Sequence, residues 1–177
     1  SAVDKYLAGT WNMRKPVPVM TTPLVLGLSG ADILPVHIES AKISKILSDH
    51  SGMTPDLIKQ LPRAIADPIA VFKSKSTGPY SGIVMMLDLK DSNGSTVIAT
   101  FHLRKTKHSY LVNQLASSYG KDSETKGSTA PIHPKNQWFV NEIAAGNLLY
   151  VNTKKADDWS NQTGLLLLPV GTTTHQL

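Results

Sequence analysis

The chain has 177 residues, a length typical of one domain, and 41% of them are hydrophobic, which is enough to form a sizeable core. It has 18 Lys and Arg residues against 13 Asp and Glu, and the resulting net charge of +5 favours anionic partners such as phosphates. The absence of cysteine excludes disulfides, thiolate catalysis and cysteine-ligated zinc, and no apolar run reaches the roughly 18 residues of a membrane span, so no stable membrane association is expected.

Residues 1–23 are expected to form a proline-containing linker or arm. Three prolines stand among polar and basic residues there, and proline favours extended backbone and lacks an amide donor. Tyr6 and Trp11 could dock this arm on the body of the protein. A single domain is expected over residues 24–177. Because the chain starts with serine and has no signal peptide, we expect it to be a fragment of a larger protein.

A short strand and two helices are predicted for the first part of this domain. The apolar run Val25–Leu28 predicts the strand. A helix is predicted over about 40–50, with Ser40 as its N-cap and apolar residues at helical spacing. Thr54–Asp56 combines a cap, a first-turn proline and an early acid, which predicts a second helix that Pro62 limits.

An antiparallel meander is predicted after the helices. The runs Ile69–Phe72, Ile83–Leu89 and Thr96–Leu103 are rich in β-branched and apolar residues. Between the last two, Asp91–Gly94 has the sequence DSNG, which is typical of a tight hairpin turn. Ser109–Leu115 alternates well enough to add another antiparallel strand.

The C-terminal part begins with a long polar loop over residues 120–136, which is the first candidate for a functional segment. We then expect a helix over Gln137–Ala145, a strand over Leu148–Val151, a helix from Thr153 through Trp159, and a last strand over Leu165–Val170. These elements predict an α+β fold, in which N-terminal helices are followed by a twisted antiparallel β-sheet.

A basic segment coincides with the end of a predicted strand. The stretch Phe101–His108 has the sequence FHLRKTKH, and such a patch suits a phosphate backbone. Strand alternation places His102 and Arg104 on the face opposite Phe101 and Leu103. The alternative is a solvated hairpin end without a function.

Further polar candidates follow in the next strand and at the C-terminus. Asn113, Ser117, Tyr119 and Lys121 offer an amide, two hydroxyls and an ammonium over a short span. The segment that ends with Thr174 and His175 is either a free tail or, if it is tied to the sheet, a hydroxyl and a titratable base at a strand end.

A metal site is not expected. His102 and His108 lack a carboxylate at a matching spacing, and the pair Asp157 and Asp158 suits a solvated helix face. There is also no glycine-rich phosphate cradle and no nucleophile elbow, so we expect no cofactor.

Three segments resemble one known family. Ile65–Phe72 (IADPIAVF), Tyr110–Lys121 (YLVNQLASSYGK) and Gly146–Tyr150 (GNLLY) are similar to the phage MuF C-terminal domain and to related domains of polymorphic toxins. The likeness covers about residues 24–170 and depends on the order of several short motifs. Residues 126–134 form an insertion relative to more compact relatives.

The resemblance implies a place among toxin-like nucleases of the barnase, EndoU, colicin and RelE group, many of which cut RNA without a metal. It transfers only Ser117, Tyr119, Gly120 and Lys121 as family positions. The implied function is that of a C-terminal toxin domain, a metal-independent ribonuclease acting on tRNA by 2′-hydroxyl transesterification.

Such cleavage needs a base, a cation for the phosphorane charge and an acid. His175 and His102 are the candidates for base and acid, with their two roles left open. Lys121 and Lys105 would stabilise charge, and Tyr119 and Thr174 would position the reacting groups. The expected substrate contacts are Arg104, Lys107, His108, Ser117 and Asn113.

The expected partners are RNA and an acidic immunity protein that protects the producing cell. The expected setting is bacterial competition, such as contact-dependent inhibition, with delivery as part of a larger secreted protein and action in the target-cell cytoplasm. Two other functions stay open, namely a non-catalytic nucleic-acid-binding or phage structural module and, third, an ADP-ribosyltransferase toxin.

Overall fold

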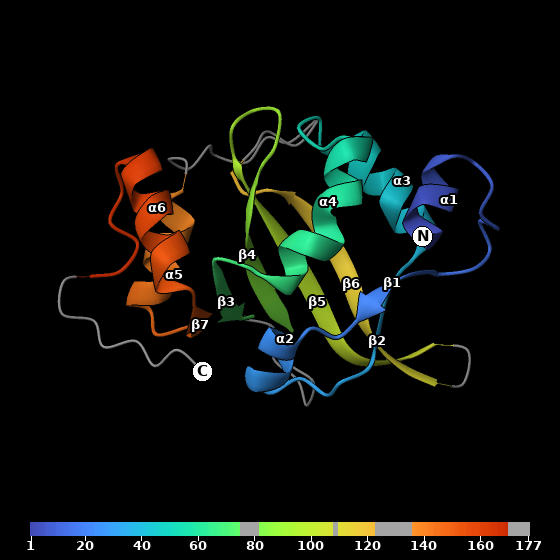
Figure 1. Cartoon of the computed structure of the whole chain (residues 1–177), viewed down its shortest axis with the longest axis horizontal. Coiled ribbons are helices and arrows are strands. Elements are labelled where there is room, and N and C mark those ends of the chain that lie inside the picture. Colours follow the sequence, from blue (N-terminus) through green and yellow to red (C-terminus); the bar gives the residue numbers. More distant parts are fainter. Residues whose placement is uncertain (75–81, 108–109, 123–135, 170–177) are drawn as a thin grey trace.

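The computed structural model describes residues 1–74, 82–107, 110–122 and 136–169 (Figure 1). These residues form an α+β fold around one sheet. The helices are α1 (Ala2–Leu7), α2 (Leu24–Leu28), α3 (Ser40–Asp49), α4 (Pro55–Ala66), α5 (Gln137–Ala144) and α6 (Thr153–Thr163). The strands are β1 (Val17–Thr21), β2 (Pro35–Ile38), β3 (Ala70–Lys73), β4 (Ile83–Lys90), β5 (Thr96–Lys107), β6 (Tyr110–Gly120) and β7 (Leu148–Val151).

The predicted meander is confirmed. Within the described residues the sheet has seven strands in the order β1-β2-β6-β5-β4-β3-β7, so β3 to β6 are neighbours in chain order and pair antiparallel. Strand β2 joins β6 as the parallel neighbour, through Val36 opposite Asn113 and His37 opposite Gln114. The sheet is therefore mostly antiparallel, and its one parallel pair brings β2 beside β6.

The turn between β4 and β5 is built as its sequence predicts. The carboxylate of Asp91 accepts hydrogen bonds from the backbone amides of Asn93 at 3.0 Å and Ser95 at 2.9 Å. Gly94 has a φ of 78°, a conformation that side chains with a Cβ disfavour. The Asp91 side chain thus replaces strand hydrogen bonds at the point where the chain reverses.

The main core lies between the sheet and the helices α1 to α4, on the face that Figure 1 shows in front. Ile43 and Ile46 of α3 and Ile58 and Leu61 of α4 are almost completely buried against it. Helix α4 starts at the Thr54 cap, whose hydroxyl accepts from the amide of Leu57 at 3.3 Å. Burying each of these aliphatic side chains contributes about 1.5–3 kcal/mol.

A second core joins α5 and α6 to the β3 and β7 end of the sheet. Phe72 of β3, Phe139 of α5 and Trp159 of α6 form its centre, with ring centroids of Phe139 and Trp159 5.9 Å apart. The Trp159 indole donates to the hydroxyl of Thr96 at 3.0 Å. Among the described residues, this core covers the β7, β3 and β4 end of the sheet and reaches Ile98 of β5 and Tyr119 of β6.

The prediction of a linker over residues 1–23 needs correction. Helix α1 and strand β1 lie in this segment, and Val17 is completely buried. The hydroxyl of Tyr6 contacts the side chain of Ser44 and donates to the carbonyl of Ser40 at 3.1 Å. The segment is part of the fold because apolar residues that stand among its prolines, such as Val17, are buried in the main core.

Two further details of the first part differ from the prediction. The run Val25–Leu28 belongs to helix α2, because the amide of Leu26 bonds to the carbonyl of Pro23 and only one side of this short run is buried. Helix α4 continues past Pro62 to Ala66. Its buried apolar face outweighs the loss of one amide donor at the proline.

The predicted last strand is also wrong over its described residues, 165–169, which contain no strand. Gly164 ends α6 in the left-handed conformation with a φ of 75°. The amide of Leu167 then bonds to the hydroxyl of Ser160 at 3.0 Å, and the Leu167 side chain is completely buried in the second core. The apolar run packs on the helix that precedes it.

Candidate nucleic-acid interface

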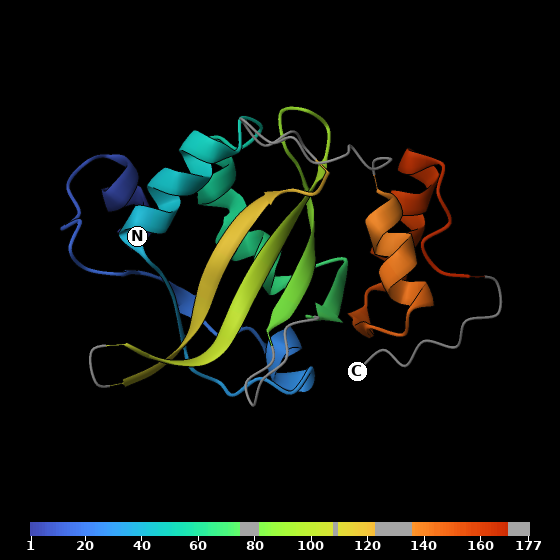
Figure 2. The same cartoon turned by 180° about the vertical axis from the view of Figure 1, so that it is seen from behind.

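The back face of β5 is polar, whereas its front face is part of the main core. Phe101 and Leu103 pack in the main core, so His102 between them points to the back, as alternation predicts. His102 is exposed, and Thr100 on the same face is half-buried. Among the described elements no helix covers β5 and β6 on this side, which Figure 2 shows with α5 and α6 standing beside the strands.

Polar side chains from three strands form a row across this face. His102 of β5 is paired with Gln114 of β6, and Gln114 is paired with His37 of β2. Paired residues share a face, and two strand spacings put the histidine backbones roughly 10 Å apart. One step along the strands, Thr100 is paired with Ser117. We call His37, Thr100, His102, Gln114 and Ser117 the open face.

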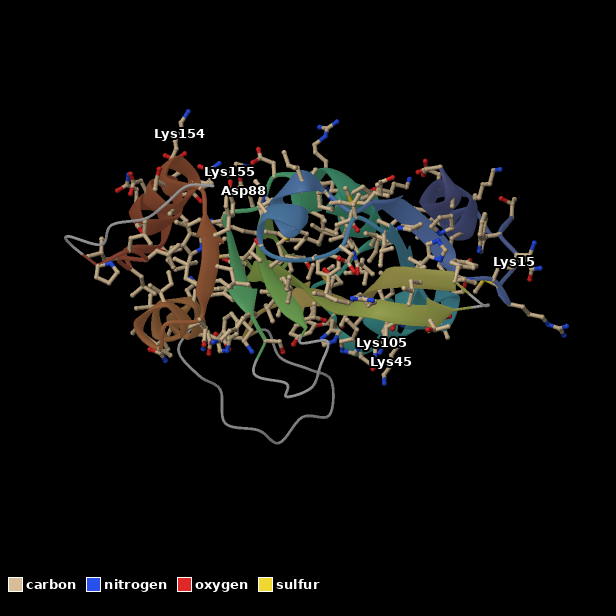
Figure 3. All side chains as sticks on the ribbon, turned by 90° about the horizontal axis from the view of Figure 1, so that it is seen from below. Lys15, Lys45, Asp88, Lys105, Lys154 and Lys155 are labelled. Carbon is tan, nitrogen blue, oxygen red and sulfur yellow. The ribbon has the colours of Figure 1, made fainter. Side chains whose placement is uncertain are left out.

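Lys105 and Lys42 lie near enough to His102 to affect its pKa. Although His102 is largely exposed, partial desolvation of its ring lowers its pKa below the usual value, and the positive charges of Lys105 and Lys42 lower it further. Lys42 comes from α3, which packs along β6. Figure 3 shows Lys45 of α3 and Lys105 on the lower, back-face side of the molecule, whereas Asp88, Lys154 and Lys155 lie on the upper side. The His102 imidazole is therefore mainly neutral near pH 7 and has the charges of Lys105 and Lys42 in its surroundings.

Tyr119 lies near the far end of β6 and stacks on a histidine. The ring centroids of Tyr119 and His50 are 4.5 Å apart, and the angle between the ring planes is 12°. Burial raises the pKa of Tyr119, and the charge of Asp122 adds to this effect. Burial also lowers the pKa of His50. At neutral pH the tyrosine thus remains a protonated hydroxyl, able to donate a hydrogen bond, and the imidazole is mainly neutral.

Lys121 is separated from the open face. At about 3.3 Å per residue, the stretch from Gln114 to Lys121 is on the order of 20 Å long. The Lys121 amide donates to the carbonyl of Thr96 at 2.8 Å, and its ammonium is 4.9 Å from the ring centroid of Trp138. The structure therefore brings His102 and Lys105 together. Ser117 lies farther along β6, two residues before Tyr119 on the same face, and Lys121 follows the end of the strand.

Asn113 and Arg104, two of the predicted substrate contacts, have partners inside the protein. Asn113 is completely buried, and its amide donates to the Thr22 hydroxyl at 2.8 Å and to the Asp32 carbonyl at 2.7 Å. Its side-chain oxygen accepts from the Arg104 amide at 3.2 Å. The Arg104 guanidinium is 3.2 Å from the Asp32 carboxylate, and its φ is 53°. These residues hold the segment before β2 against β5 and β6.

Several predicted site residues lie outside the described residues. These are His108, Thr174 and His175, together with most of the loop over 120–136, including its 126–134 insertion. For Lys107 the structure describes the backbone in β5 but not the side chain.

The sequence interpretation missed His37, Gln114 and Lys42. His37 alternates with the buried residues Val36 and Ile38, a pattern that indicates a strand with one polar face. Lys42 lies beside buried Ile43 on an amphipathic helix. The sequence thus contains local signals for these residues, but only the pairing of β2 with β6 shows that His37 and Gln114 lie side by side.

Neither a metal-binding cluster nor a membrane-spanning helix is found among the residues that the structure describes. Among the described residues no group of three or more His, Asp or Glu side chains is arranged to hold a metal ion. The helices within these residues all lack the length and hydrophobicity needed to cross a bilayer.

Comparisons with known proteins identify a family. A family model of the phage MuF C-terminal domain matches residues 42–158, which run from α3 into α6 and include Lys42, His102, Lys105, Gln114 and Ser117. Searches of curated proteins and of solved structures gave no match. Because the match covers well over half of the 177 residues, the chain belongs to the phage MuF C-terminal domain family.

Proposed function

We propose that this domain is a metal-independent endoribonuclease that cuts RNA by attack of a 2′-hydroxyl on the adjacent phosphate. The observation that carries the proposal is the open face, where the paired positions of His37, Gln114 and His102 form a row. The lysines Lys42 and Lys105 lie near enough to lower the pKa of His102. Two imidazoles and a cation are the groups that such cleavage needs.

His102 is the proposed base. Its lowered pKa keeps the imidazole neutral near pH 7, so that it can remove the proton from the 2′-hydroxyl. The 2′-oxygen then forms a bond to phosphorus, and the bond from phosphorus to the 5′-oxygen breaks. His37, in its protonated form, donates a proton to the leaving 5′-oxygen. The products are a 2′,3′-cyclic phosphate and a 5′-hydroxyl.

Gln114 and the lysines would act on the phosphate. Gln114 stands between the two histidines, so its amide can donate to a phosphate oxygen as negative charge develops. Lys105 and Lys42 would attract the RNA backbone and stabilise the same charge. Ser117, one step along the face, would position the ribose or phosphate.

A toxin role and tRNA as substrate belong to the same proposal. They are supported by the resemblance of the YLVNQLASSYGK segment to toxin domains and by the net charge of +5. An acidic immunity protein would fit the lysines near His102 through charge complementarity. Delivery as part of a larger protein into the target cytoplasm is proposed on the same resemblance.

The test compares histidine variants with a matched control. His102→Gln and His37→Gln should each lower the rate of tRNA cleavage by at least about 10²-fold, the usual contribution of a general acid or base. His50→Gln is the control, because His50 lies against Tyr119 at the far end of β6. Wild-type activity in both open-face variants would overturn the proposed site.

A non-catalytic nucleic-acid-binding or phage structural module is the second candidate. The lysines near His102 support it as well, because a phosphate backbone needs only cations for binding. RNA that is bound tightly by folded protein and recovered uncut would favour this alternative. Binding that survives the histidine variants but is lost in Lys105→Ala would point the same way.

A further inference from the structure

A pocket of about 450 Å³ lies where the N-terminal segment meets the sheet. It brings together the chain before and in β1, strand β2 and the first residue of β6, which are far apart in the sequence. Its lining combines aromatic rings, two prolines and a lysine. The lining residues are Trp11, Lys15, Pro16, Pro18, His37 and Tyr110.

Contacts within the protein orient the walls of this pocket. The Trp11 indole donates to the carbonyl of Lys15 at 3.2 Å, and the Ser40 hydroxyl donates to the same carbonyl at 2.6 Å. On the other side, the rings of His37 and Tyr110 meet edge to face at 5.9 Å with an angle of 82°. A ligand would therefore meet rings that are already oriented, which lowers the entropic cost of binding.

The chemistry of the lining fits a nucleobase. A base has two flat apolar faces, which stack on aromatic rings, and a polar edge. Tyr110 is 45% exposed, an unusually open position for an aromatic side chain, and Trp11 is half-buried. Lys15 in the lining and the exposed neighbour Arg14 supply cations for the phosphate that accompanies the base.

The pocket also adjoins the open face. His37 lines the pocket and is paired with Gln114, which in turn is paired with His102. A nucleotide whose base entered the pocket would thus place its phosphate toward the histidine row. We propose that this pocket binds one unpaired nucleobase of the RNA, next to the phosphate that is cut.

The role of the pocket in cleavage rests on the proposed ribonuclease function, but base binding itself does not. The proposal requires a single-stranded nucleotide, because a base within a duplex is stacked on its neighbours and cannot enter a pocket between protein rings. It therefore predicts that the protein selects loops or ends of RNA.

The binding test uses a short 2′-O-methyl oligoribonucleotide, which has no 2′-hydroxyl to attack the phosphate, in calorimetric titration of the intact chain. Trp11→Ala and Tyr110→Ala should each weaken binding by about 5- to 100-fold, the range expected for loss of one base-stacking contact. Trp11→Phe should retain most of the affinity because it keeps an aromatic ring. Leu111→Ala is the control, since this neighbour of Tyr110 is 38% exposed and does not line the pocket.

Thermal unfolding of each variant would show whether it folds. If Trp11→Ala does not fold, Tyr110→Ala and Trp11→Phe still test the pocket. Two results would overturn the proposal that the pocket binds an unpaired base. One is an unchanged affinity of Tyr110→Ala for the oligonucleotide, and the other is a duplex of the same sequence that competes as well as the single strand. If RNA is cut while both alanine variants keep the wild-type KM, the ribonuclease stands and the pocket fails. If the oligonucleotide needs Trp11 and Tyr110 but no RNA is cut, the pocket stands and the ribonuclease fails.

Discussion

Replacing Asn113 by alanine should destabilise the fold strongly while leaving the chemistry of the site intact. The substitution removes three hydrogen bonds inside the protein, to the Thr22 hydroxyl, the Asp32 carbonyl and the Arg104 amide. A buried hydrogen bond contributes about 1 kcal/mol, and a stranded partner costs about 1–3 kcal/mol. The three contributions do not simply add, because all three partners bond to the same side chain. We therefore expect a loss of about 3–5 kcal/mol in the free energy of unfolding.

Urea unfolding measures this loss directly. With a slope of about 1–3 kcal/mol per molar urea, the midpoint should fall by roughly 2 M without a change in slope. Asn161→Ala, at an exposed position on α6, is the matched control and should stay within about 0.5 kcal/mol of wild type. An Asn113→Ala variant with wild-type stability and weakened RNA binding would refute this reasoning and make Asn113 a substrate contact.

Two further predictions concern the turn and the pH dependence of the site. Gly52→Ala should lower the melting temperature by several degrees, because a Cβ at this position would overlap the Asp91 carboxylate that shapes the hairpin turn; an unchanged melting temperature would contradict this. Lys105→Ala should raise the pKa of His102, since the lysine charge helps to lower it, and should move the acidic limb of the activity profile to higher pH. NMR titration of His102 should show the same shift, and Lys154→Ala, on the opposite side of the molecule, should show none.

The lowered pKa values also set the sign of the pH effect on stability. His102 and His50 both have pKa values below that of an unfolded histidine, so the unfolded chain binds protons more readily. The free energy of unfolding should therefore be highest above about pH 6.5 and decline as the pH falls through the folded-state values. A chain carrying both His102→Gln and His50→Gln should show a weaker decline in urea unfolding between pH 7 and pH 5.

The parts of the fold that sequence predicted are those fixed by neighbouring residues. The β4 to β5 turn follows from Asp91 and Gly94, and α4 follows from the cap at Thr54, because these signals act within a few residues. The run Val25–Leu28 was ambiguous, since four apolar residues fit a buried strand or a short helix equally well. Tertiary packing decided in favour of the helix.

The open face could be predicted only in part, for a similar reason. Alternation within β5 is local, so the outward direction of His102 follows from Phe101 and Leu103. His37 reaches the same face only because β2 pairs parallel to β6, a contact between residues far apart in the chain. Asn113 has the composition of a substrate contact, but its position opposite Val36 turns it into the core.

Cleavage of RNA in the absence of metal is the measurement that tests the proposed function most directly. Purified domain should cut tRNA in EDTA and leave a 2′,3′-cyclic phosphate on one fragment and a 5′-hydroxyl on the other. The same RNA with a 2′-O-methyl group at the cleavage position should remain intact there. Folded protein that leaves tRNA uncut, or that cuts only with added divalent metal, would contradict the proposed mechanism.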